Sequence, residues 1–306
     1  MTEFLKSLDT VRLSGAWLTI GSFDGVHRGH QELIRRLVND AHAAGEPAVV
    51  LTFFPHPSVV LRGIQGPFYL TDPTERATLL AGLGVDAVIT LEFNLEMAAL
   101  TAADFMRRLH ERLALKCLWV GNNFALGRKR EGNVDILTRL GDELGYQVQV
   151  VTPVEVDGVL ISSTQIRTWL ADGEVGQVKN GLGRWYRISG AIIHGDGRGR
   201  KIGIPTANLE LWPQRALPAN GVYAVYGLVD GKCWPGVANI GTRPTFETQP
   251  VLPRLEVLLL DYDGDLYGQE ISVDFVARLR SEQRFSSVEA LLAQIEQDKH
   301  TARNLL

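Results

Sequence analysis

The sequence has 306 residues, of which 45% are hydrophobic and 22% are charged. This length and this balance predict a globular protein with about two domains of about 150 residues each. The net charge of −4 and the pI near 6.0 argue against a nucleic-acid-binding protein, which usually presents a basic surface.

No stretch of the sequence reaches the roughly 18 consecutive apolar residues that a membrane-spanning helix needs. The first residues lack an apolar stretch behind a basic start, so they do not have the pattern of a secretory signal. The two cysteines, Cys117 and Cys233, lie far apart in apolar runs, and neither belongs to a C-x-x-C arrangement. We therefore expect a cytoplasmic protein with no membrane attachment, no zinc site and two buried cysteines.

Short apolar runs alternate with amphipathic stretches in the first half of the chain. This alternation predicts a parallel sheet with helices on both faces. Ligands bind such sheets at the carboxyl ends of the strands, so we expect the chemistry in the loops that follow them. The predicted strands are Ala16–Gly21, Ala48–Phe54, Asp86–Leu91, Cys117–Gly121 and Gln147–Val151. The predicted helices are Gln31–Ala44, Pro73–Leu83, Ala102–Leu113 and Asn133–Leu144.

The pattern changes in the second half, where a helical connection is followed by short strands between Gly, Pro and Asp clusters. This pattern is typical of a small β-barrel, and we place the domain boundary so that residues 1–182 form the first domain and residues 183–306 the second. The predicted helices are Gln165–Leu170, Val175–Lys179 and, at the end of the chain, Ser287–Asp298. The predicted strands are Tyr186–His194, Gly221–Leu228, Val237–Ile240, Leu255–Asp261 and Ile271–Phe275.

A segment rich in glycine and histidine, Gly21–His30, follows the first predicted strand and leads into a helix. Free backbone N–H groups and the helix dipole make such a junction an anion site. His27 and His30 would add donors directed at the same phosphates, and Gly29 permits close approach. A single histidine is more often a helix cap, but this long pattern favours phosphate binding. The segment closely resembles the H-x-G-H signature of nucleotidylyltransferases, in the G-x-F-D-G-V-H-x-G-H form of bacterial FAD synthetases.

Three further segments resemble other motifs of the same family. Thr52–Pro57 (T-F-F-P-H-P) resembles its flavin-side loop, and a rigid loop that caps the sheet is the alternative for His56. Gly121–Gly127 (G-N-N-F-A-L-G) resembles its G-x-(D or N)-F-x-F-G segment. Ser162–Arg167 (S-S-T-Q-I-R) resembles its I-S-S-T-x-I-R signature, whereas hydroxyls at a helix start taken alone are usually only caps.

The resemblance implies how these residues are divided between two substrates. Attack of the ionised FMN phosphate on the α-phosphorus of ATP needs positioning and charge neutralisation rather than a strong base. The expected catalytic residues of this site are therefore the donors His27, His30 and Arg167. The implied ATP-binding residues are Gly21, Phe23, Asp24, Gly29, His30, Ser163, Thr164 and Arg167. The implied flavin-binding residues are Phe54, His56, Pro57, Asn123 and Phe124.

A second candidate site lies in the glycine-rich segment Gly190–Asn208. Its glycines permit a loop that surrounds phosphates with backbone N–H groups, and its cations would add positive charge. A mobile hairpin tip has the same composition. The segment ends in Pro205–Asn208 (P-T-A-N), which matches the riboflavin kinase signature, in which hard oxygen ligands hold Mg²⁺ and nucleotide phosphates. The resemblance implies Mg²⁺ ligation by Thr206 and Asn208. It implies ATP binding by Gly195, Gly197, Arg200, Gly203, Thr206 and Asn208.

Glu256 is the expected general base of the second site. It lies in the apolar run Leu255–Asp261, and other segments that match the riboflavin kinase family occur in the expected order around it. The primary alcohol of riboflavin must lose a proton as it attacks the γ-phosphorus of ATP, which requires a carboxylate within reach. The alternative is a solvent-facing glutamate on a strand.

The two motif sets together identify the chain as a member of the bacterial bifunctional riboflavin kinase/FMN adenylyltransferase family. The family implies a Rossmann-like nucleotidyltransferase domain followed by a small flavokinase β-barrel with a C-terminal helix. It implies conversion of riboflavin to FMN and then to FAD with ATP and Mg²⁺. We expect a monomer or weak homo-oligomer that binds no nucleic acid. The alternatives are a chain that keeps one activity, a non-catalytic flavin sensor and a transferase for another phosphorylated alcohol; the retained motif residues disfavour them.

Overall fold

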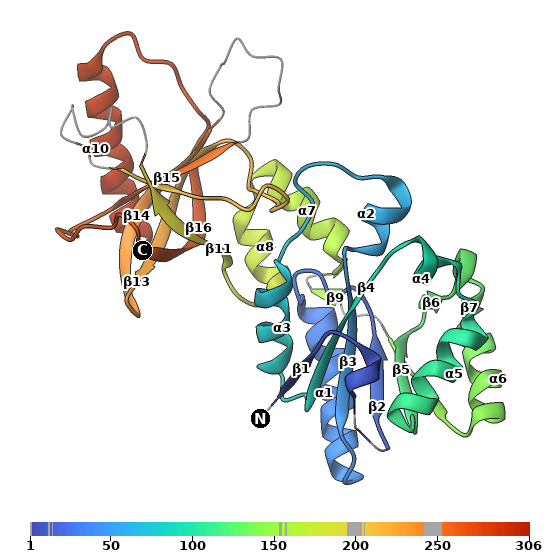
Figure 1. Ribbon diagram of the computed structural model, residues 1–306. Helices are drawn as coiled ribbons and strands as arrows, with labels where there is room; N and C mark the ends of the chain where they lie inside the picture. The colour runs from blue at the N-terminus through green and yellow to red at the C-terminus, as the bar shows by residue number, and fades with distance from the viewer. Residues whose placement is uncertain are drawn as a thin grey trace. The chain divides into compact units, whose positions relative to one another are not determined.

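A computed structural model describes residues 2–306 except 12, 14, 153, 154, 157, 195–203, 205 and 242–252. The chain divides into two compact units, Met1–Ser163 and Thr164–Leu306, which are described separately here (Figure 1). In the described part of the chain, no helix combines the length and the apolar composition that are needed to cross a membrane.

The first unit contains a parallel sheet of six strands in the order β1-β4-β3-β2-β5-β8. This confirms the predicted parallel sheet. Strand β2 has β3 on one side and β5 on the other, so the strand order reverses there, as at a topological switch point. The strands are β1 (Glu3–Leu5), β2 (Trp17–Ile20), β3 (Ala48–Phe54), β4 (Ala87–Glu92), β5 (Cys117–Gly121) and β8 (Gln147–Val151).

Helices cover both faces of this sheet, because the sheet has an apolar cluster on each side. One cluster includes the buried residues of α1 and α3, and the other includes those of α5 and α6. The helices are α1 (Arg28–Ala43), α2 (Pro57–Arg62), α3 (Pro73–Ala81), α4 (Leu95–Ala99), α5 (Ala102–Leu113) and α6 (Val134–Leu144). Smaller elements are η1 (Leu8–Thr10), β6 (Ala125–Leu126), η2 (Arg128–Arg130), β7 (Gly132–Asn133), β9 (Glu155–Val156) and β10 (Val159–Leu160).

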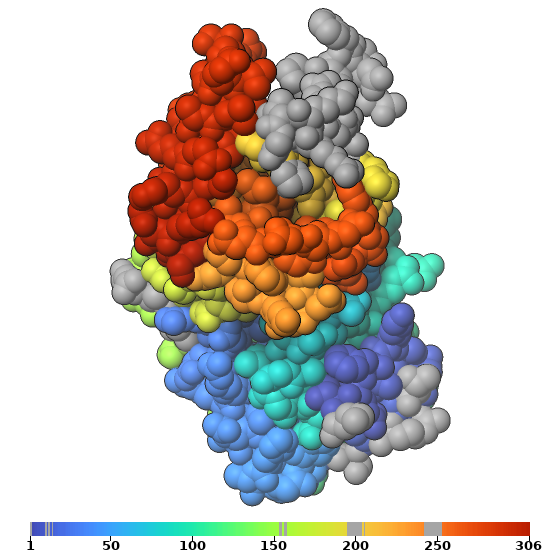
Figure 2. Space-filling model, turned by 90° about the vertical axis from the view of Figure 1, so that its left-hand side faces the viewer, coloured from blue at the N-terminus to red at the C-terminus, as the bar shows by residue number. Residues whose placement is uncertain are grey.

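The second unit begins in helix α7, continues with α8 and then forms a closed antiparallel barrel in the order β11-β12-β15-β14-β13-β16. Helix α10 packs on the outside of the barrel against β13, β14 and β16; in Figure 2 it appears in red beside the orange strands. The predicted barrel with a C-terminal helix is confirmed. The helices are α7 (Ser163–Asp172), α8 (Val175–Leu182) and α10 (Val288–Leu305). The strands are β11 (Tyr186–Ile193), β12 (Ala207–Leu209), β13 (Gly221–Val229), β14 (Lys232–Gly241), β15 (Arg254–Leu259) and β16 (Glu270–Arg280).

The two cysteines differ in their surroundings. Cys117 lies in β5 and is buried, and burial raises the pKa of its thiol to about 11. The expectation that Cys233 is also buried is wrong, because its side chain is exposed. Strand β14 starts at Lys232 rather than Val237, which places Cys233 beside the turn of the β13–β14 hairpin.

Candidate active sites

The segment Gly21–His30 lies at the switch point of the first unit, between the end of β2 and the first turn of α1. Helix α1 begins at Arg28 rather than Gln31, because His27 is its N-cap: the His27 Nδ1 accepts a hydrogen bond of 3.4 Å from the His30 N–H. The two imidazole rings stack with their centroids 3.5 Å apart. The histidine that caps the helix therefore also lies against the second histidine of the H-x-G-H segment.

His30 is held as a neutral imidazole. Burial, the neighbouring His27 and the Arg76 guanidinium keep the pKa of His30 well below its ordinary value. Its Nδ1 is buried and has no hydrogen-bond partner among the described residues, and its ring lies edge-on to Phe23 at 5.0 Å. At neutral pH the N-terminus of α1 and Arg76 therefore contribute positive charge beside His30, whereas the His30 ring itself contributes none.

Asp24 holds the segment in place from inside. Its side chain is fully buried, and Oδ1 accepts hydrogen bonds from the Leu70 N–H (2.9 Å), the Thr71 N–H (3.2 Å) and the Thr71 hydroxyl (3.4 Å). The Ser163 hydroxyl donates to the Asp24 carbonyl at 2.8 Å. Both residues, predicted to bind ATP, thus contribute to the framework of the loop.

The loop between the glycines is backbone-strained. Phe23 has φ 47° and Val26 has φ 41°, although non-glycine residues, and branched ones above all, rarely adopt positive φ. Such strain persists only where the surrounding structure enforces it. The hydrogen bonds to Asp24 supply that constraint.

Replacing Asp24 with alanine is expected to release this constraint. It leaves buried donors of Leu70 and Thr71 unpaired, at about 1–3 kcal/mol for each such group. We expect the amides of Leu70 and Thr71 to lose most of their protection in native-state hydrogen exchange. Replacement of the partly exposed helix-capping Asp72 should instead cost about 1 kcal/mol and leave those two amides protected; equal loss in both variants would contradict the role of Asp24.

Gly29 is required by the ring stack beneath it. A Cβ built at Gly29 would lie 3.2 Å from the Cε1 and Nδ1 atoms of His27. At Gly21, a Cβ would lie 2.9 Å from the Phe23 ring. Both glycines thus give room to neighbouring aromatic rings in the loop, a need that the sequence pattern did not reveal.

The segment Thr52–Pro57, which was predicted to face the flavin, runs from the end of β3 to the start of α2, and aromatic side chains hold it in place. The His56 Nδ1 accepts from the Ser58 N–H (3.0 Å) and caps α2, which starts at Pro57. The His56 N–H donates to the Tyr69 hydroxyl (2.9 Å). Rings pack in series, with Phe54 5.6 Å from Tyr69, and Phe68 5.0 Å from His56. Phe68 and Tyr69 belong to this loop's surroundings, but nothing in the motif predicted them.

The remaining predicted residues of the first site are more widely placed. Asn123, in the turn after β5, is exposed, and its carbonyl accepts from Arg130 Nη2 at 3.1 Å. Phe124 is partly buried and packs against the core. Thr164 and Arg167 lie in α7, on the second-unit side of the division at Ser163. Among the described contacts, Ser163 is hydrogen-bonded to the loop after β2, whereas Asn123 is bonded to Arg130 and not to that loop.

Arg76 is the main residue that the sequence analysis missed in this unit. It lies on α3 and is fully buried. Its Nη1 donates to the Ser22 carbonyl (3.0 Å), and its Nη2 donates to the Phe53 carbonyl (3.1 Å). An arginine in an amphipathic helix normally faces solvent, but Arg76 is four positions before the buried Leu80 and shares its helix face. This spacing from an apolar residue was the signal in the sequence that could have indicated a buried arginine.

The second unit contains a cavity of about 350 Å³ between the barrel wall, the residues after β16 and helix α10. Glu256 and Thr206 both line it. Leu255 and Val257, on either side of Glu256, are buried, so Glu256 projects to the opposite face of β15. The apolar lining residues are Ile204, Val222, Val237, Leu258, Phe285, Leu291 and Ile295.

Strand register surrounds Glu256 with amides. It lies opposite Asn208 of β12 on one side and opposite Asn239 of β14 on the other, and residues directly opposite on neighbouring strands project from the same face. The short strand β12 was not predicted. Because of it, Asn208 is the strand neighbour of Glu256. The predicted residues Gly195, Gly197, Arg200 and Gly203 lie outside the described residues.

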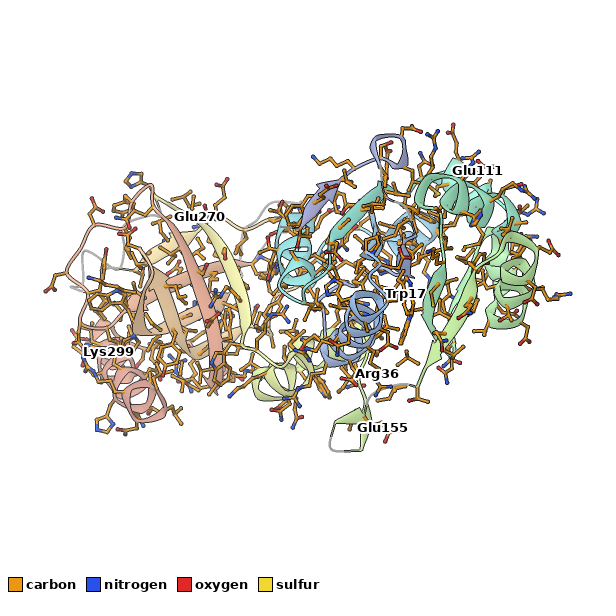
Figure 3. The ribbon with its side chains drawn as sticks, turned by 90° about the horizontal axis from the view of Figure 1, so that it is seen from below. Trp17, Arg36, Glu111, Glu155, Glu270 and Lys299 are labelled. Carbon is orange, nitrogen blue, oxygen red and sulfur yellow. The ribbon has the colours of Figure 1, made fainter. Side chains whose placement is uncertain are left out.

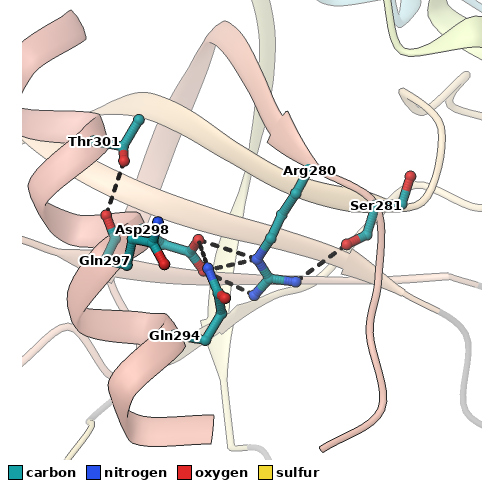
Figure 4. Close-up of polar contacts among 6 residues, drawn as sticks. All are labelled: Arg280, Ser281, Gln294, Gln297, Asp298 and Thr301. Carbon is teal, nitrogen blue, oxygen red and sulfur yellow. Dashed lines mark hydrogen bonds and ion pairs between the residues drawn. The ribbon is translucent and has the colours of Figure 1, made fainter. Parts of the chain in front are cut away.

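Arg280 and Asp298, which both line the cavity, form a largely buried ion pair. Figure 4 shows this pair and its neighbours. Asp298 of α10 receives hydrogen bonds from Arg280 of β16, with Nη2 2.8 Å from Oδ2 and Nε 3.0 Å from Oδ1, and another of 3.0 Å from the Gln294 amide. The Arg280 Nη1 donates to the Ser281 carbonyl at 3.1 Å. These bonds join α10 to the end of β16, so the pair fixes the position of this part of the cavity wall.

We expect Asp298→Ala to destabilise the second unit by about 3 kcal/mol, because it leaves the largely buried Arg280 charge without its carboxylate partner. The matched control is Arg303→Ala, which breaks the exposed pair that Arg303 of the same helix forms with Asp261 and should cost about 0–1 kcal/mol. Urea denaturation, with hydrogen exchange of α10 to identify the transition, measures both. Similar losses in the two variants would show that the pair does not hold this wall.

Comparison with known proteins agrees with this division of sites. The chain matches the FAD synthetase family model over residues 10–165 and the riboflavin kinase model over residues 182–306. It is 43% identical over 292 residues to a bifunctional riboflavin kinase/FMN adenylyltransferase from Pseudomonas fluorescens, covering 95% of this chain and 93% of that protein. The protein of the same name from Escherichia coli K12 is 42% identical over 301 residues, covering 98% and 95%.

A solved structure from Streptococcus pneumoniae, described as a macrolide-efflux protein, is similar over 99% of each chain, with 32% identity and a TM-score of 0.89. Both halves of the sequence and the arrangement of strands therefore have counterparts in known proteins. The chain belongs to the family of bifunctional riboflavin kinase/FMN adenylyltransferases.

Proposed function

We propose that this chain phosphorylates riboflavin to FMN and adenylates FMN to FAD, with ATP as the donor in both reactions. We assign the adenylyltransferase to residues 1–182 and the kinase to residues 183–306. The observation that carries the proposal is the match of one chain to both family models in succession. Each matched stretch also contains one of the two predicted sets of site residues, which supports the proposal.

In the kinase, Glu256 accepts the proton of the riboflavin 5′-hydroxyl as its oxygen attacks the γ-phosphorus of ATP. A phosphorus–oxygen bond forms to the ribityl oxygen, the bond to ADP breaks, and the proton moves to the Glu256 carboxylate. The apolar lining of the cavity suits the flavin ring and limits access of water, which would otherwise compete for the phosphoryl group.

We assign Mg²⁺ to Thr206 and Asn208. Their side chains offer neutral hard oxygens beside Glu256, a donor set that suits a cation whose other ligands are phosphates and water. When bound, Mg²⁺ neutralises charge on the nucleotide phosphates. Gly195, Gly197, Arg200 and Gly203 are assigned to the same phosphates on the resemblance of their segment alone.

In the adenylyltransferase, a phosphate oxygen of FMN attacks the α-phosphorus of ATP, and pyrophosphate leaves. No side chain has to remove a proton, so His27, His30, Thr164 and Arg167 serve as donors to the nucleotide phosphates. The neutral state of His30 supports this role, because a neutral imidazole still offers one N–H. Asp24 and Ser163 hold the loop, while Phe54, His56, Pro57, Asn123 and Phe124 are assigned to the flavin.

The test is separation of flavins by chromatography after the protein is incubated with riboflavin, ATP and MgCl₂. FMN should form first and FAD second, and supplied FMN should give FAD and pyrophosphate without riboflavin. Formation of FMN alone would remove the adenylyltransferase assignment. Tight FMN binding without turnover would favour a flavin sensor. We further propose that the protein is cytoplasmic, that it is a monomer or weak homo-oligomer, and that it binds no nucleic acid. Light scattering with and without DNA tests the oligomeric state and the absence of DNA binding.

A further inference from the structure

Arg76 joins the two loops that flank the first site. Ser22, whose carbonyl accepts from Nη1 at 3.0 Å, lies just beyond β2 in the H-x-G-H loop. Phe53, whose carbonyl accepts from Nη2 at 3.1 Å, lies near the end of β3 and is the second residue of the flavin-side loop, Thr52–Pro57. Strands β2 and β3 are neighbours in the parallel sheet. One guanidinium thus connects the carboxyl ends of both strands.

The burial of this cation is costly in free energy. Burial lowers the pKa of Arg76, and the negative charges of Asp24 and Asp72 offset this only in part. Within the described residues Arg76 makes no ion pair, and its Nε is buried without a hydrogen-bond partner. A buried charge with this arrangement is weak as a stabilising device. Its geometry, two parallel donors on two strand ends, indicates a role in placement.

We propose that Arg76 is a positioning residue for adenylyl transfer, which sets the distance between the nucleotide loop and the flavin-side loop. The inference rests on the proposed function of the first unit. Arg76 acts through the Ser22 and Phe53 carbonyls and contacts neither substrate. Two neighbouring contacts act in the same sense: Asp24 holds the nucleotide loop to Leu70 and Thr71, and Tyr69 holds His56. The segment 69–76 therefore braces both loops.

The planar fork of arginine is essential to this role. Its terminal nitrogens point in fixed directions and reach two acceptors at once, whereas the lysine ammonium is a single point on a flexible stem. Lysine keeps the charge but cannot hold both carbonyls in the same way. A displacement of about 1 Å in a reacting group can reduce a rate by about 10²-fold.

The experiment compares Arg76→Lys and Arg76→Met with Arg36→Met. Arg36 is 51% exposed on α1 (Figure 3) and pairs only with Glu32 among the described residues. We expect kcat for FAD formation from FMN to fall about 10²-fold in both Arg76 variants, with KM for ATP changed much less. Phosphorylation of riboflavin by the same molecules should stay at the wild-type rate, as should both activities of Arg36→Met.

The histidine ring signals in NMR give a second readout. The titratable and charged groups that act on the pKa of His30 are His27 on the same loop and Arg76 from α3. Removal of the Arg76 charge should raise the pKa of His30 towards its ordinary value in Arg76→Met, and Arg76→Lys should leave it low. The two variants thus separate the charge of Arg76, which only lysine keeps, from its geometry, which neither keeps.

A wild-type kcat for FAD formation in Arg76→Lys would overturn the inference, and this variant decides alone if Arg76→Met does not fold. A loss that is restored in Arg76→Lys would also overturn it, because charge would then be sufficient. Failure of the Arg76 inference can be distinguished from failure of the proposed function. If the wild-type protein itself forms no FAD, the proposed function of the first unit is wrong.

Discussion

Glu256→Gln is expected to lower kcat for riboflavin phosphorylation by about 10²–10⁴-fold, the contribution of a positioned general base. Glutamine preserves the shape of the side chain and its place between Asn208 and Asn239, but it cannot accept the proton from the riboflavin hydroxyl. Adenylation of supplied FMN by the same molecule should be unchanged. Chromatography of flavins with each substrate in turn measures both rates.

The matched control is Glu270→Gln, in an exposed position of β16 in the same barrel (Figure 3). It should leave both activities at wild-type levels. If Glu256→Gln retained the phosphorylation rate, the base would have to be another group, and Glu256 would be the solvent-facing strand residue that its sequence also allowed.

His30→Ala is expected to reduce FAD formation by about 10²–10³-fold, the usual cost of removing a preorganised donor to developing charge. The substitution also removes the ring that stacks on His27 and touches Phe23, so both neighbours lose their fixed orientation. Riboflavin should still be phosphorylated, so FMN should accumulate. A time course from riboflavin, analysed by chromatography, detects this accumulation.

The control for this variant is His42→Ala. His42 lies in the last turn of the same helix and forms an exposed pair with Asp86, 2.9 Å away. The His42→Ala variant should form FAD at the wild-type rate. Undiminished FAD formation in His30→Ala would show that the helix N-terminus and backbone hold the phosphates without this imidazole.

The sequence predicted the parts of the fold that depend on periodicity. Strands β3, β5 and β8 and helix α5 have the predicted bounds, because long apolar runs and regular helical spacing leave few alternatives. The edge strand β1 was missed, since its three residues are mostly exposed and its register is set by β4 alone. Strand β12 was missed for a similar reason: it is short and is defined by pairing with distant β11 and β15.

The candidate sites show the same limit. A local motif located the H-x-G-H loop, because its residues are contiguous and begin a helix. It did not reveal that the Asp24 carboxylate accepts hydrogen bonds from Leu70 and Thr71, since those bonds join segments about 46 positions apart in the chain. Arg76 was missed because its burial depends on the packing of α3 against the sheet. In each case tertiary contacts decide a role that residue type leaves open.

The Arg280–Asp298 pair has a consequence for solution conditions. Ions screen charges that water surrounds, with a Debye length of about 3 Å at 1 M salt, but the side chains of this pair are only 16% and 6% exposed. Concentrated salt should therefore weaken the exposed Arg303–Asp261 pair and leave the cavity wall intact. The second unit is expected to tolerate high ionic strength during purification without losing the shape of the cavity beside Glu256.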